Sequence, residues 1–327
     1  MGEKVNLAVI GAGYWGRKLI REYIALSKKR SDLSLKAIVD KAKERLYKIS
    51  VELGIPAEKL YINYDDILKN PKINAVHIAT PNETHYKIAM EALERGKHVL
   101  LEKPMALTSR EAYKLAQTSE SKGLVLLVGH IYRFNNAVTK VKEIVEEGKL
   151  GEPYYMKLYW TTLMNKLPQN RDILFDLAPH PIDIVNYVLE EWPIKVYTQA
   201  KSYIRGRKRL EEAAFSLGEP PEGQTILIVL SWIQPGPKKR EFILVGSKAT
   251  VYVDALNQKI TLYDNNRTLK QIHVQANNTI ESMISHFIDR IINGNPPRSS
   301  ALIGARTVSI IEAMQRSLNL GKPVYIT

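Results

Sequence analysis

The chain has 327 residues, a length that fits two domains better than one. Its apolar share of 45% is normal for a globular protein with a full core, and no run of 18 apolar residues indicates a transmembrane helix. Cysteine is absent, which excludes disulfides, thiol nucleophiles and cysteine metal sites. The first expected strand begins almost at the start and leaves no room for a signal peptide, so we expect a cytoplasmic protein with no membrane partner and no metal ion.

The formal net charge is +13, and such a basic balance raises the question of nucleic-acid binding. The Lys and Arg residues are scattered, however, and no DNA-binding motif is present, so we expect no nucleic-acid partner. The densest basic group, residues 205–209, is interpreted as a solvated loop. We attribute the charge instead to the attraction of anionic small molecules.

The first expected element is an apolar strand over residues 5–10, which ends in glycines spaced G-x-G-x-x-G and is followed by a helical segment over 17–27. The first glycine allows a tight turn, the second lets the backbone approach a pyrophosphate, and the third allows close packing of the helix. An ordinary glycine turn is the alternative. The residues expected to contact the dinucleotide here are Gly11, Gly13, Tyr14, Trp15 and Gly16.

A second apolar strand over residues 33–39 ends in Asp40, which lies 24 residues after Gly16. An acid at this distance is placed to hydrogen-bond an adenosine ribose, whereas it would repel the 2′-phosphate of NADP. We therefore favour NAD as the cofactor. NADP stays the alternative because Lys41, Lys43 and Arg45 stand close to this carboxylate.

Further strands are expected over residues 75–79, 98–101 and 124–128, with helices over 41–53, 65–69, 84–95 and 109–122. This alternation predicts a parallel sheet covered by helices on both faces. Ligands of such sheets bind outside the carboxyl ends of the strands. The expected cofactor-binding residues that follow the later strands are Thr80, Pro81, Asn82, His85, Glu102 and Lys103.

After about residue 130 the pattern changes from alternating strands and helices to a run of strands. One more helix is expected over 137–147, followed by strands over 154–162, 195–204, 225–232, 240–245, 250–253 and 259–263. This indicates an antiparallel sheet, packed on helices near 182–189, 282–292 and 302–320. Residues 205–223 are interpreted as a mobile loop or insertion.

The fold class is thus α/β: an N-terminal Rossmann domain with a doubly wound parallel sheet, and a C-terminal α+β domain with an open, mainly antiparallel sheet. We place the first domain at residues 1–129 and the second, for substrate binding and oligomerisation, at 130–327. Whether the C-terminal tail returns to the first domain is left open.

Four motifs, at residues 11–16, 79–85, 101–104 and 176–183, carry a resemblance to a known family. In this order and spacing they resemble the glucose–fructose oxidoreductase / inositol dehydrogenase / rhizopine-catabolism (Gfo/Idh/MocA) family, over nearly the whole chain. The resemblance implies NAD(P)-linked oxidation or reduction at a sugar carbon. It also implies homodimers or homotetramers that often bury the sheet of the second domain.

The resemblance assigns catalytic roles to Lys103, which matches the family's Glu-Lys-Pro motif, and to Asp176 and His180, which match its D-x-x-x-H motif. A histidine can accept the hydroxyl proton, and a lysine can hold the oxygen over the nicotinamide. Asp176 is expected just before a helix, where it fixes a substrate hydroxyl or orients the histidine. A solvated lysine and a helix-start histidine are the alternatives, and Asp183 is interpreted as structural.

Two further residues keep two interpretations each. His85 either contacts the cofactor or packs near the helix start at Asn82, and Arg133 either binds substrate or cofactor or pairs with a carboxylate at the domain junction. Many family members have a glycine pair several residues before the catalytic histidine. This chain has Asn170-Arg171-Asp172 instead and looks more like the members that oxidise nucleotide-linked amino sugars at the 3-position.

We expect Arg171 to bind an anionic group of the substrate, because a guanidinium fork matches both carboxylate and phosphate; a surface arginine is the alternative. The favoured function is therefore an NAD-dependent dehydrogenase of a nucleotide sugar. A dehydrogenase of a free sugar or of a polyol such as inositol is the second hypothesis. A non-catalytic dinucleotide sensor is the third, and the intact Lys103, Asp176 and His180 argue against it.

Overall fold

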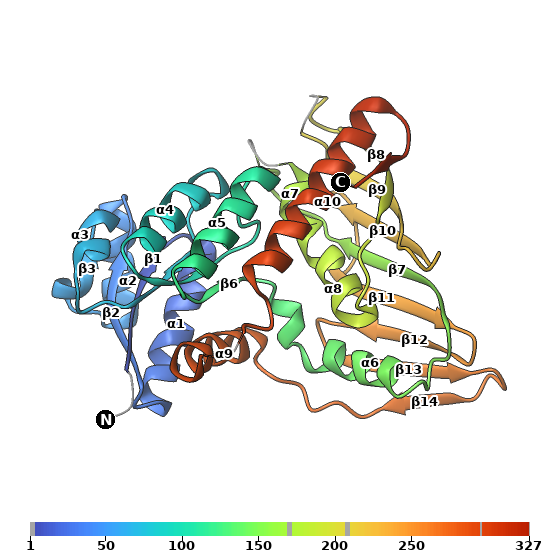
Figure 1. Ribbon diagram of the computed structural model, residues 1–327, viewed down its shortest axis with the longest axis horizontal. Coiled ribbons are helices and arrows are strands. Elements are labelled where there is room, and N and C mark those ends of the chain that lie inside the picture. The colour runs from blue at the N-terminus through green and yellow to red at the C-terminus, as the bar shows by residue number, and fades with distance from the viewer. Residues whose placement is uncertain (1–3, 169–171, 207–209, 295, 327) are drawn as a thin grey trace. The chain divides into compact units, whose positions relative to one another are not determined.

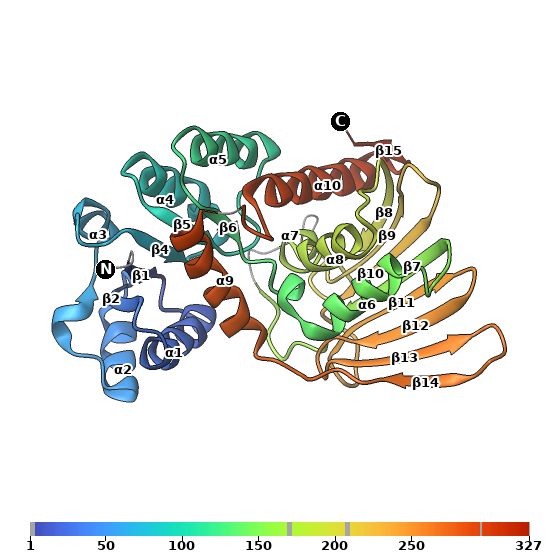
Figure 2. The ribbon, with the colours of Figure 1, turned by 60° about the horizontal axis from the view of Figure 1, so that its bottom comes forward.

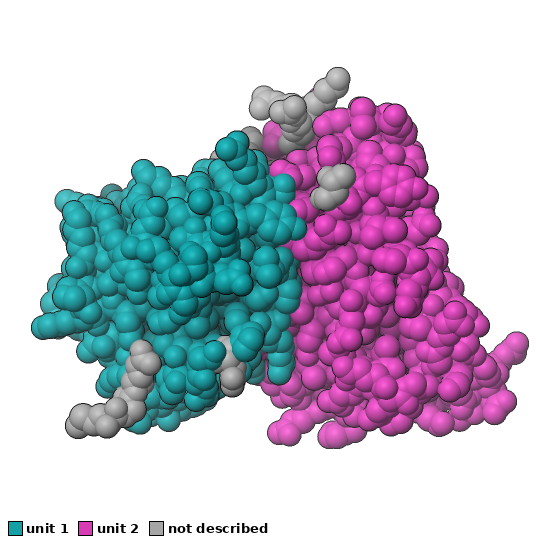
Figure 3. All heavy atoms as spheres, in the orientation of Figure 1, with its two compact units in different colours: residues 1–130, 280–305 teal, residues 131–279, 306–327 magenta. Residues whose placement is uncertain are grey.

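The computed structural model describes residues 4–168, 172–206, 210–294 and 296–326. It divides into two compact units, residues 1–130 with 280–305 and residues 131–279 with 306–327 (Figure 3). No helix in these described ranges is both long and apolar enough to cross a membrane. Each unit is built on its own sheet, and the two are described separately.

The first unit contains, within the described residues, a six-stranded sheet in the order β3-β2-β1-β4-β5-β6. All of its strand pairs are parallel. Its strands are β1 (Val5–Ile10), β2 (Leu33–Val39), β3 (Leu60–Tyr61), β4 (Ala75–Ile78), β5 (His98–Leu101) and β6 (Leu126–Val128). The order reverses between β1 and β4, which is the position where doubly wound sheets bind their ligands. The predicted Rossmann sheet is confirmed.

Helices cover both faces of this sheet, with α1 and α2 on one side and α4 and α5 on the other (Figure 2). Their bounds are α1 (Tyr14–Lys29), α2 (Lys43–Leu53), α3 (Tyr64–Lys69), α4 (Asn82–Glu94) and α5 (Ser109–Ser121), with a short 3₁₀ turn η1 (Ala57–Lys59). Local sequence signals determine where some of these helices begin. The hydroxyl of Thr108 accepts the backbone N–H of Glu111 at 3.2 Å, which starts α5 as its capping sequence predicts.

Helix α9 (Thr279–Asn293) belongs to this first unit, although the sequence predicted that it would pack on the sheet of the second domain. Ion pairs tie it to the end of α1 and the residue that follows: Lys29 with Glu281 at 2.8 Å, and Arg30 with Asp289 at 2.7 Å. An amphipathic pattern shows that a helix has a buried face but does not show which sheet that face meets, so this prediction was wrong.

The second unit holds a nine-stranded sheet, counted over the described residues, in the order β14-β13-β12-β11-β7-β10-β9-β8-β15. Among the described strands of this sheet, β7 and β10 pair in parallel and the other neighbours pair antiparallel. Its longer strands are β7 (Pro153–Thr161), β8 (Lys195–Lys201), β9 (Ala213–Glu219), β10 (Thr225–Ser231), β11 (Lys239–Gly246), β12 (Ala249–Asp254) and β13 (Lys259–Asp264). The shorter ones are β14 (Leu269–Ile272) and β15 (Val324–Tyr325). The predicted open, mainly antiparallel sheet is confirmed.

Helices lie on one face of this sheet (Figure 1). They are α6 (Asn136–Glu146), α7 (Ile173–Leu177), α8 (Pro179–Leu189) and the residues of α10 (Ala301–Leu320) from 306 onward, with a 3₁₀ turn η2 (Ile131–Phe134) before α6. Asn135 starts α6 by accepting the N–H groups of Ala137 and Val138 at 3.1 and 3.2 Å. None of the described helices of the unit lies on the opposite face of the sheet.

Strand β9 lies inside the segment that the sequence predicted to be a mobile loop, so that prediction was wrong for this part. The buried carboxylate of Glu212 accepts the N–H groups of Ile204 and Arg205 at 3.1 and 3.0 Å. It also pairs with the Arg205 side chain at 2.9 Å. Arg205 is therefore an anchor and not a solvated charge, while residues 207–209 of the same basic group lie outside the described residues.

The Glu212 anchor predicts an acid-sensitive contribution to stability. Burial alone would raise the pKa of this carboxyl, but hydrogen bonds from the backbone and from Arg205 lower it from 4.5 to about 2. The lowered value means that the stabilisation is complete above pH 4.5 and is lost as the pH falls toward 2. Glu212→Gln should cost about 3 kcal/mol at neutral pH, measured by urea unfolding.

The matched control is Glu222→Gln, which removes an exposed carboxylate from the loop between β9 and β10 and should leave the free energy of unfolding nearly unchanged. The difference between wild type and Glu212→Gln should shrink as the pH is lowered. A constant difference from neutral pH to pH 3 would contradict the proposed ionisation of Glu212.

Candidate functional site

The turn between β1 and α1 contains three glycines, two at positions with no room for a side chain and one beside open space. Gly11 has a φ of +103°, and a Cβ there would lie 2.5 Å from the carbonyl oxygen of Ala79. A Cβ on Gly16 would lie 2.0 Å from the carbonyl oxygen of Gly11. A Cβ on Gly13 would meet no described atom within 4 Å. The first and third glycines therefore allow the turn to form, and the second leaves open space above it.

The first turn of α1 suits an anion. Its N-cap is Gly13, which offers no side-chain cap, and the described residues of the first helical turn include no acid. A helix N-terminus directs backbone N–H groups toward an external acceptor, and the helix dipole adds partial positive charge. The predicted pyrophosphate site therefore fits this turn. Tyr14, the first helical residue, is largely exposed, and Lys18 lies over its ring at 4.5 Å.

Asp40 at the end of β2 holds the glycine turn in place. Its buried carboxylate accepts the N–H of Ala12 at 2.8 Å and that of Ala42 at 2.9 Å, and Arg45 approaches it to 3.4 Å. A carboxylate has about four acceptor positions, so one remains for a ribose hydroxyl. The predicted ribose contact is compatible with this arrangement, and Asp40 has a structural role in addition to it.

The segment after β4 is held by side chains of its own helix. The hydroxyl of Thr84 donates to the carbonyl of Pro81 at 2.7 Å and lies 2.7 Å from the Thr80 hydroxyl. His85 is fully buried, with Nδ1 2.8 Å from the carbonyl oxygen of Pro104 and Nε2 2.9 Å from that of Thr80. Burial lowers the pKa of His85.

His85 is enclosed between two carbonyl oxygens of its own unit, which supports the alternative that it packs near the helix start over the prediction that it contacts the cofactor. The side chain positions the segments that follow β4 and β5 relative to each other. Asn82, by contrast, is half-buried in the first turn of α4, where its predicted contact with the cofactor stays untested.

Glu102 and Lys103 follow β5 directly and differ in burial. Glu102 is 6% exposed and its carboxylate lies 3.3 Å from Nε2 of His77, whereas Lys103 is half-buried. The Rossmann sheet thus gathers the glycine turn, Asp40, Thr80 and Lys103 at one edge, because the carboxyl ends of parallel strands meet there. Sequence reasoning found this edge correctly.

In the second unit, Asp176 and His180 lie on one face of a nearly continuous helical segment. Ala178, which links α7 and α8, has helical dihedrals, with φ of −63° and ψ of −28°. Asp176 is consequently inside α7 and not just before a helix, as the sequence predicted. Asp172, Asp176 and His180 follow each other at intervals of four residues and are half-buried, while the other described residues between them are buried.

Three residues that the sequence analysis missed surround this face. The ring of Tyr132 meets those of His180 and Trp160 edge-on, each with centroids 5.2 Å apart. The buried guanidinium of Arg240 donates to the carbonyl of Thr161 at 3.3 Å, and Tyr132 and Asp176 both favour its charged form. Burial raises the pKa of Tyr132 to about 12 and lowers that of Arg240. The signal for Arg240 was its alternation in β11 with Phe242, which places a charge on the buried side.

Arg133, predicted as a substrate ligand, forms a buried ion pair. Its Nε donates to Asp183 at 2.6 Å, and one of its terminal nitrogens donates to the side-chain oxygen of Asn186 at 2.6 Å. The structure thus favours the alternative in which Arg133 pairs with a carboxylate, and it agrees with a structural Asp183. Arg171 lies outside the described residues, so its predicted contact with an anion is not tested.

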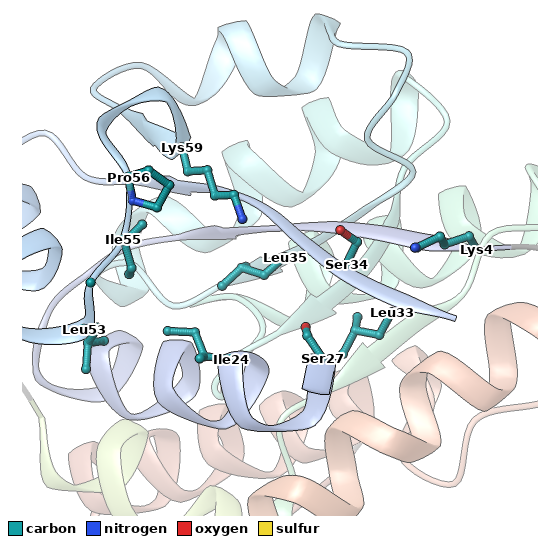
Figure 4. Close-up of a pocket in the computed structure, with 11 residues that line it drawn as sticks. Lys4, Ile24, Ser27, Leu33, Ser34, Leu35, Leu53, Ile55, Pro56 and Lys59 are labelled. Carbon is teal, nitrogen blue, oxygen red and sulfur yellow. The ribbon is translucent and has the colours of Figure 1, made fainter. Parts of the chain in front are cut away.

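A hollow of about 390 Å³ opens in the first unit between α1, β2 and the residues after α2 (Figure 4). Lys4 and Leu33 on its rim stand at the amino ends of β1 and β2, while Ile24 and Leu35 form part of its apolar wall. Since dinucleotides bind at the carboxyl ends of the strands, this hollow is not part of the candidate cofactor site.

The open space at Gly13 predicts a clean separation of folding from cofactor binding. Gly13 has a φ of −70°, which alanine adopts without strain, so Gly13→Ala should fold normally. The new methyl group stands where the phosphates must approach, and NADH should bind at least about tenfold more weakly, as measured by calorimetry. Gly218→Ala, which changes a glycine of β9 in the second unit whose φ is not positive, is the control. Unchanged NADH affinity in Gly13→Ala would remove the turn from the cofactor site.

Comparison with known proteins accounts for both units. Residues 5–130 match the family model for the "Oxidoreductase family, NAD-binding Rossmann fold", and residues 138–252 match that for the "GFO/IDH/MocA C-terminal domain". An uncharacterised oxidoreductase of Bacillus subtilis, YfiI, is 28% identical over 233 residues, 64% of this chain and 59% of its own length. The match thus spans less than two thirds of that relative.

Two further relatives have assigned activities. The UDP-N-acetylglucosamine 3-dehydrogenase of Acidithiobacillus ferrooxidans is 26% identical over 79% of this chain and 77% of its own. The myo-inositol 2-dehydrogenase of Thermotoga maritima is 22% identical over 88% of this chain and 89% of its own. Among solved structures, an oxidoreductase of Agrobacterium radiobacter in complex with NAD⁺, L-tartaric acid and magnesium has a TM-score of 0.86 at 21% identity, covering 99% of this chain and 98% of its own.

The two domain models, in the expected order, agree with a glycine turn on a parallel sheet and with a second unit built on an open sheet. The chain belongs to the Gfo/Idh/MocA family of oxidoreductases, and its first domain is that family's NAD-binding Rossmann domain.

Proposed function

We propose that this chain is an NAD-dependent dehydrogenase that transfers a hydride between a sugar-type carbinol carbon and the nicotinamide. The observation that carries the proposal is the half-buried face of α7 and α8, which presents Asp176 and His180 at a spacing of four residues. Lys103 at the carboxyl edge of the Rossmann sheet supplies the third group. The proposal requires that Lys103 and His180 meet at the same substrate hydroxyl.

The three side chains have complementary tasks. When bound, NAD supplies the acceptor for the hydride. Oxidation of the carbinol carbon also requires that its hydroxyl lose a proton, and His180 accepts that proton because a histidine titrates near neutral pH. The Lys103 ammonium hydrogen-bonds the same oxygen and stabilises the negative charge that develops on it. Asp176 holds a neighbouring hydroxyl or orients His180.

A nucleotide sugar oxidised at its 3-hydroxyl is the substrate class that we favour. The likeness to the UDP-N-acetylglucosamine 3-dehydrogenase supports it, and so do the net charge of +13 and the residue Arg171. The likeness to a myo-inositol 2-dehydrogenase supports a free polyol or sugar as the second candidate. We propose NAD in preference to NADP because the carboxylate of Asp40 would repel a 2′-phosphate, although Arg45 lies beside it.

Replacing His180 tests the proposal. His180→Asn should lower kcat by about 10²- to 10⁴-fold, because the proton acceptor is lost, while NADH affinity stays nearly unchanged. The measurement is NADH formation with a panel of nucleotide sugars and polyols. His273→Asn, which changes an exposed histidine of the same unit, is the control and should retain full activity. Turnover by wild type with polyols alone would reject the nucleotide sugar, and full activity in His180→Asn would reject the proton acceptor.

We also propose that the chain forms a homodimer or homotetramer through the helix-free face of the nine-stranded sheet. Alternation along the strands turns one set of side chains to this face, and many of them are apolar. Neighbouring strands pair Leu217 with Leu227 and Phe215 with Val229 on it. Phe215 and Leu217 are 47% and 46% exposed in the single chain. An apolar surface that continues across several strands marks an interaction site.

The oligomer is tested by light scattering after size exclusion. Wild type should elute as a dimer or tetramer, and the variant Leu217→Arg should shift toward monomer because a charge enters the apolar interface. Leu320→Arg changes a leucine at the end of α10 that is 59% exposed and should keep the wild-type mass. A monomeric wild type at micromolar concentration would contradict this interface.

A further inference from the structure

We propose that Tyr23 and His77 are positioning residues that hold Glu102 as a fixed, buried negative charge beside Lys103. That charge strengthens binding of the oxidised, positively charged nicotinamide relative to the neutral reduced form. The inference rests on the proposed function, in which NAD binds at the glycine turn and Lys103 lies beside its nicotinamide. It adds a role for two residues of α1 and β4 that neither the motifs nor the comparisons single out.

The three side chains form a hydrogen-bonded chain through the interior of the first unit. The hydroxyl of Tyr23 on α1 lies 2.9 Å from Nδ1 of His77 on β4. Nε2 of the same ring lies 3.3 Å from Oε1 of Glu102, which follows β5. Tyr23 and His77 are fully buried and Glu102 is 6% exposed. These hydrogen-bonded side chains therefore extend from one helix layer through the sheet to its carboxyl edge.

The hydrogen-bond donors among these three side chains are directed toward the carboxylate of Glu102. Burial raises the pKa of Tyr23 well above its ordinary value, so its hydroxyl keeps its proton and donates to Nδ1 of His77. When Nδ1 accepts from Tyr23, the ring N–H that faces Glu102 is the one on Nε2. Burial alone would raise the pKa of Glu102, but His77, the Trp15 indole and the Lys103 charge together hold it below its ordinary value. The lowered pKa agrees with a carboxylate at this buried position.

The remaining neighbours confine the carboxylate and link it to the cofactor site. A Cβ on Gly129, which follows β6, would lie 2.9 Å from Oε2 of Glu102, so the absence of a side chain at position 129 makes room for this group. The indole of Trp15, which belongs to the glycine turn, helps to lower the pKa of the same carboxyl, although its Nε1 makes no hydrogen bond within the described residues. Glu102 therefore lies between the phosphate-binding turn and the end of β6.

A fixed negative charge at this place offsets the repulsion between two positive groups of the proposed site, the ammonium of Lys103 and the oxidised nicotinamide. The ammonium of Lys103 is needed to stabilise the substrate oxygen, but a cation beside the nicotinamide repels the oxidised ring, which is itself positive. The carboxylate of Glu102 interacts with Lys103 and offsets this repulsion. Loss of the Glu102 charge should consequently weaken NAD⁺ binding and leave NADH binding much less affected.

The experiment compares the dissociation constants of NAD⁺ and NADH in the full-length protein, measured by calorimetry without substrate. In Glu102→Gln, which keeps the size of the side chain, the Kd of NAD⁺ should rise about tenfold relative to that of NADH. Tyr23→Phe should shift the ratio in the same direction by a smaller factor, because the His77 ring loses its hydrogen-bond partner at Nδ1 and holds the Glu102 carboxylate less firmly. A merely structural role would weaken both forms equally.

Tyr64→Phe is the matched control, since it removes a hydroxyl that bonds Glu91 elsewhere in the same unit and should leave the ratio unchanged. If Glu102→Gln does not fold, the Tyr23→Phe ratio decides alone. An unchanged ratio in a variant that still binds both forms would overturn the inference and leave the proposed function intact. Failure of the wild-type protein to bind either form would instead contradict the proposed function.

Discussion

The tight turn between β1 and α1 is the constraint on which the rest of the first unit depends. A Cβ on Gly16 would lie 2.0 Å from the carbonyl oxygen of Gly11, so the contact between strand and helix leaves no room for a side chain. Asp40 secures the same turn from β2 by accepting the N–H of Ala12. This closure leaves the first N–H groups of α1 and the open space at Gly13 as the surface for phosphate, and it sets the edge of the sheet at which a dinucleotide binds.

Buried charges then arrange the functional groups in each unit. In the first unit, Glu102 precedes Lys103 in the sequence and contacts His77, which in turn bonds Tyr23. In the second, Arg240 and Tyr132 lie behind Asp176 and His180. In both places the groups with proposed chemical roles are half-buried, while the residues that position them are fully enclosed. Such support fixes the geometry of reacting groups at a cost in desolvation that their hydrogen bonds offset.

Local signals were enough to predict much of this structure, because glycine spacing, capping residues and periodicity act over a few residues. The turn at residues 11–16, the cap at Thr108 and the strand-end positions of Asp40 and Lys103 all follow from such signals. The packing of α9 on the first unit, the strand within 205–223 and the enclosure of His85 depend on contacts with distant segments. Arg240 and Tyr132 were missed for the same reason, since no local sequence signal near them indicates that they contact Asp176 or His180.

The central claim is that the amine of Lys103 and the imidazole of His180 serve one substrate hydroxyl at the nicotinamide. A crystal structure of the protein with NADH and a substrate identified by turnover tests it most directly. We predict the pyrophosphate against the N–H groups of residues 13–15, and both nitrogens within about 3 Å of the reacting oxygen. A dinucleotide bound away from the glycine turn, or a substrate oxygen contacted by neither side chain, would contradict the account.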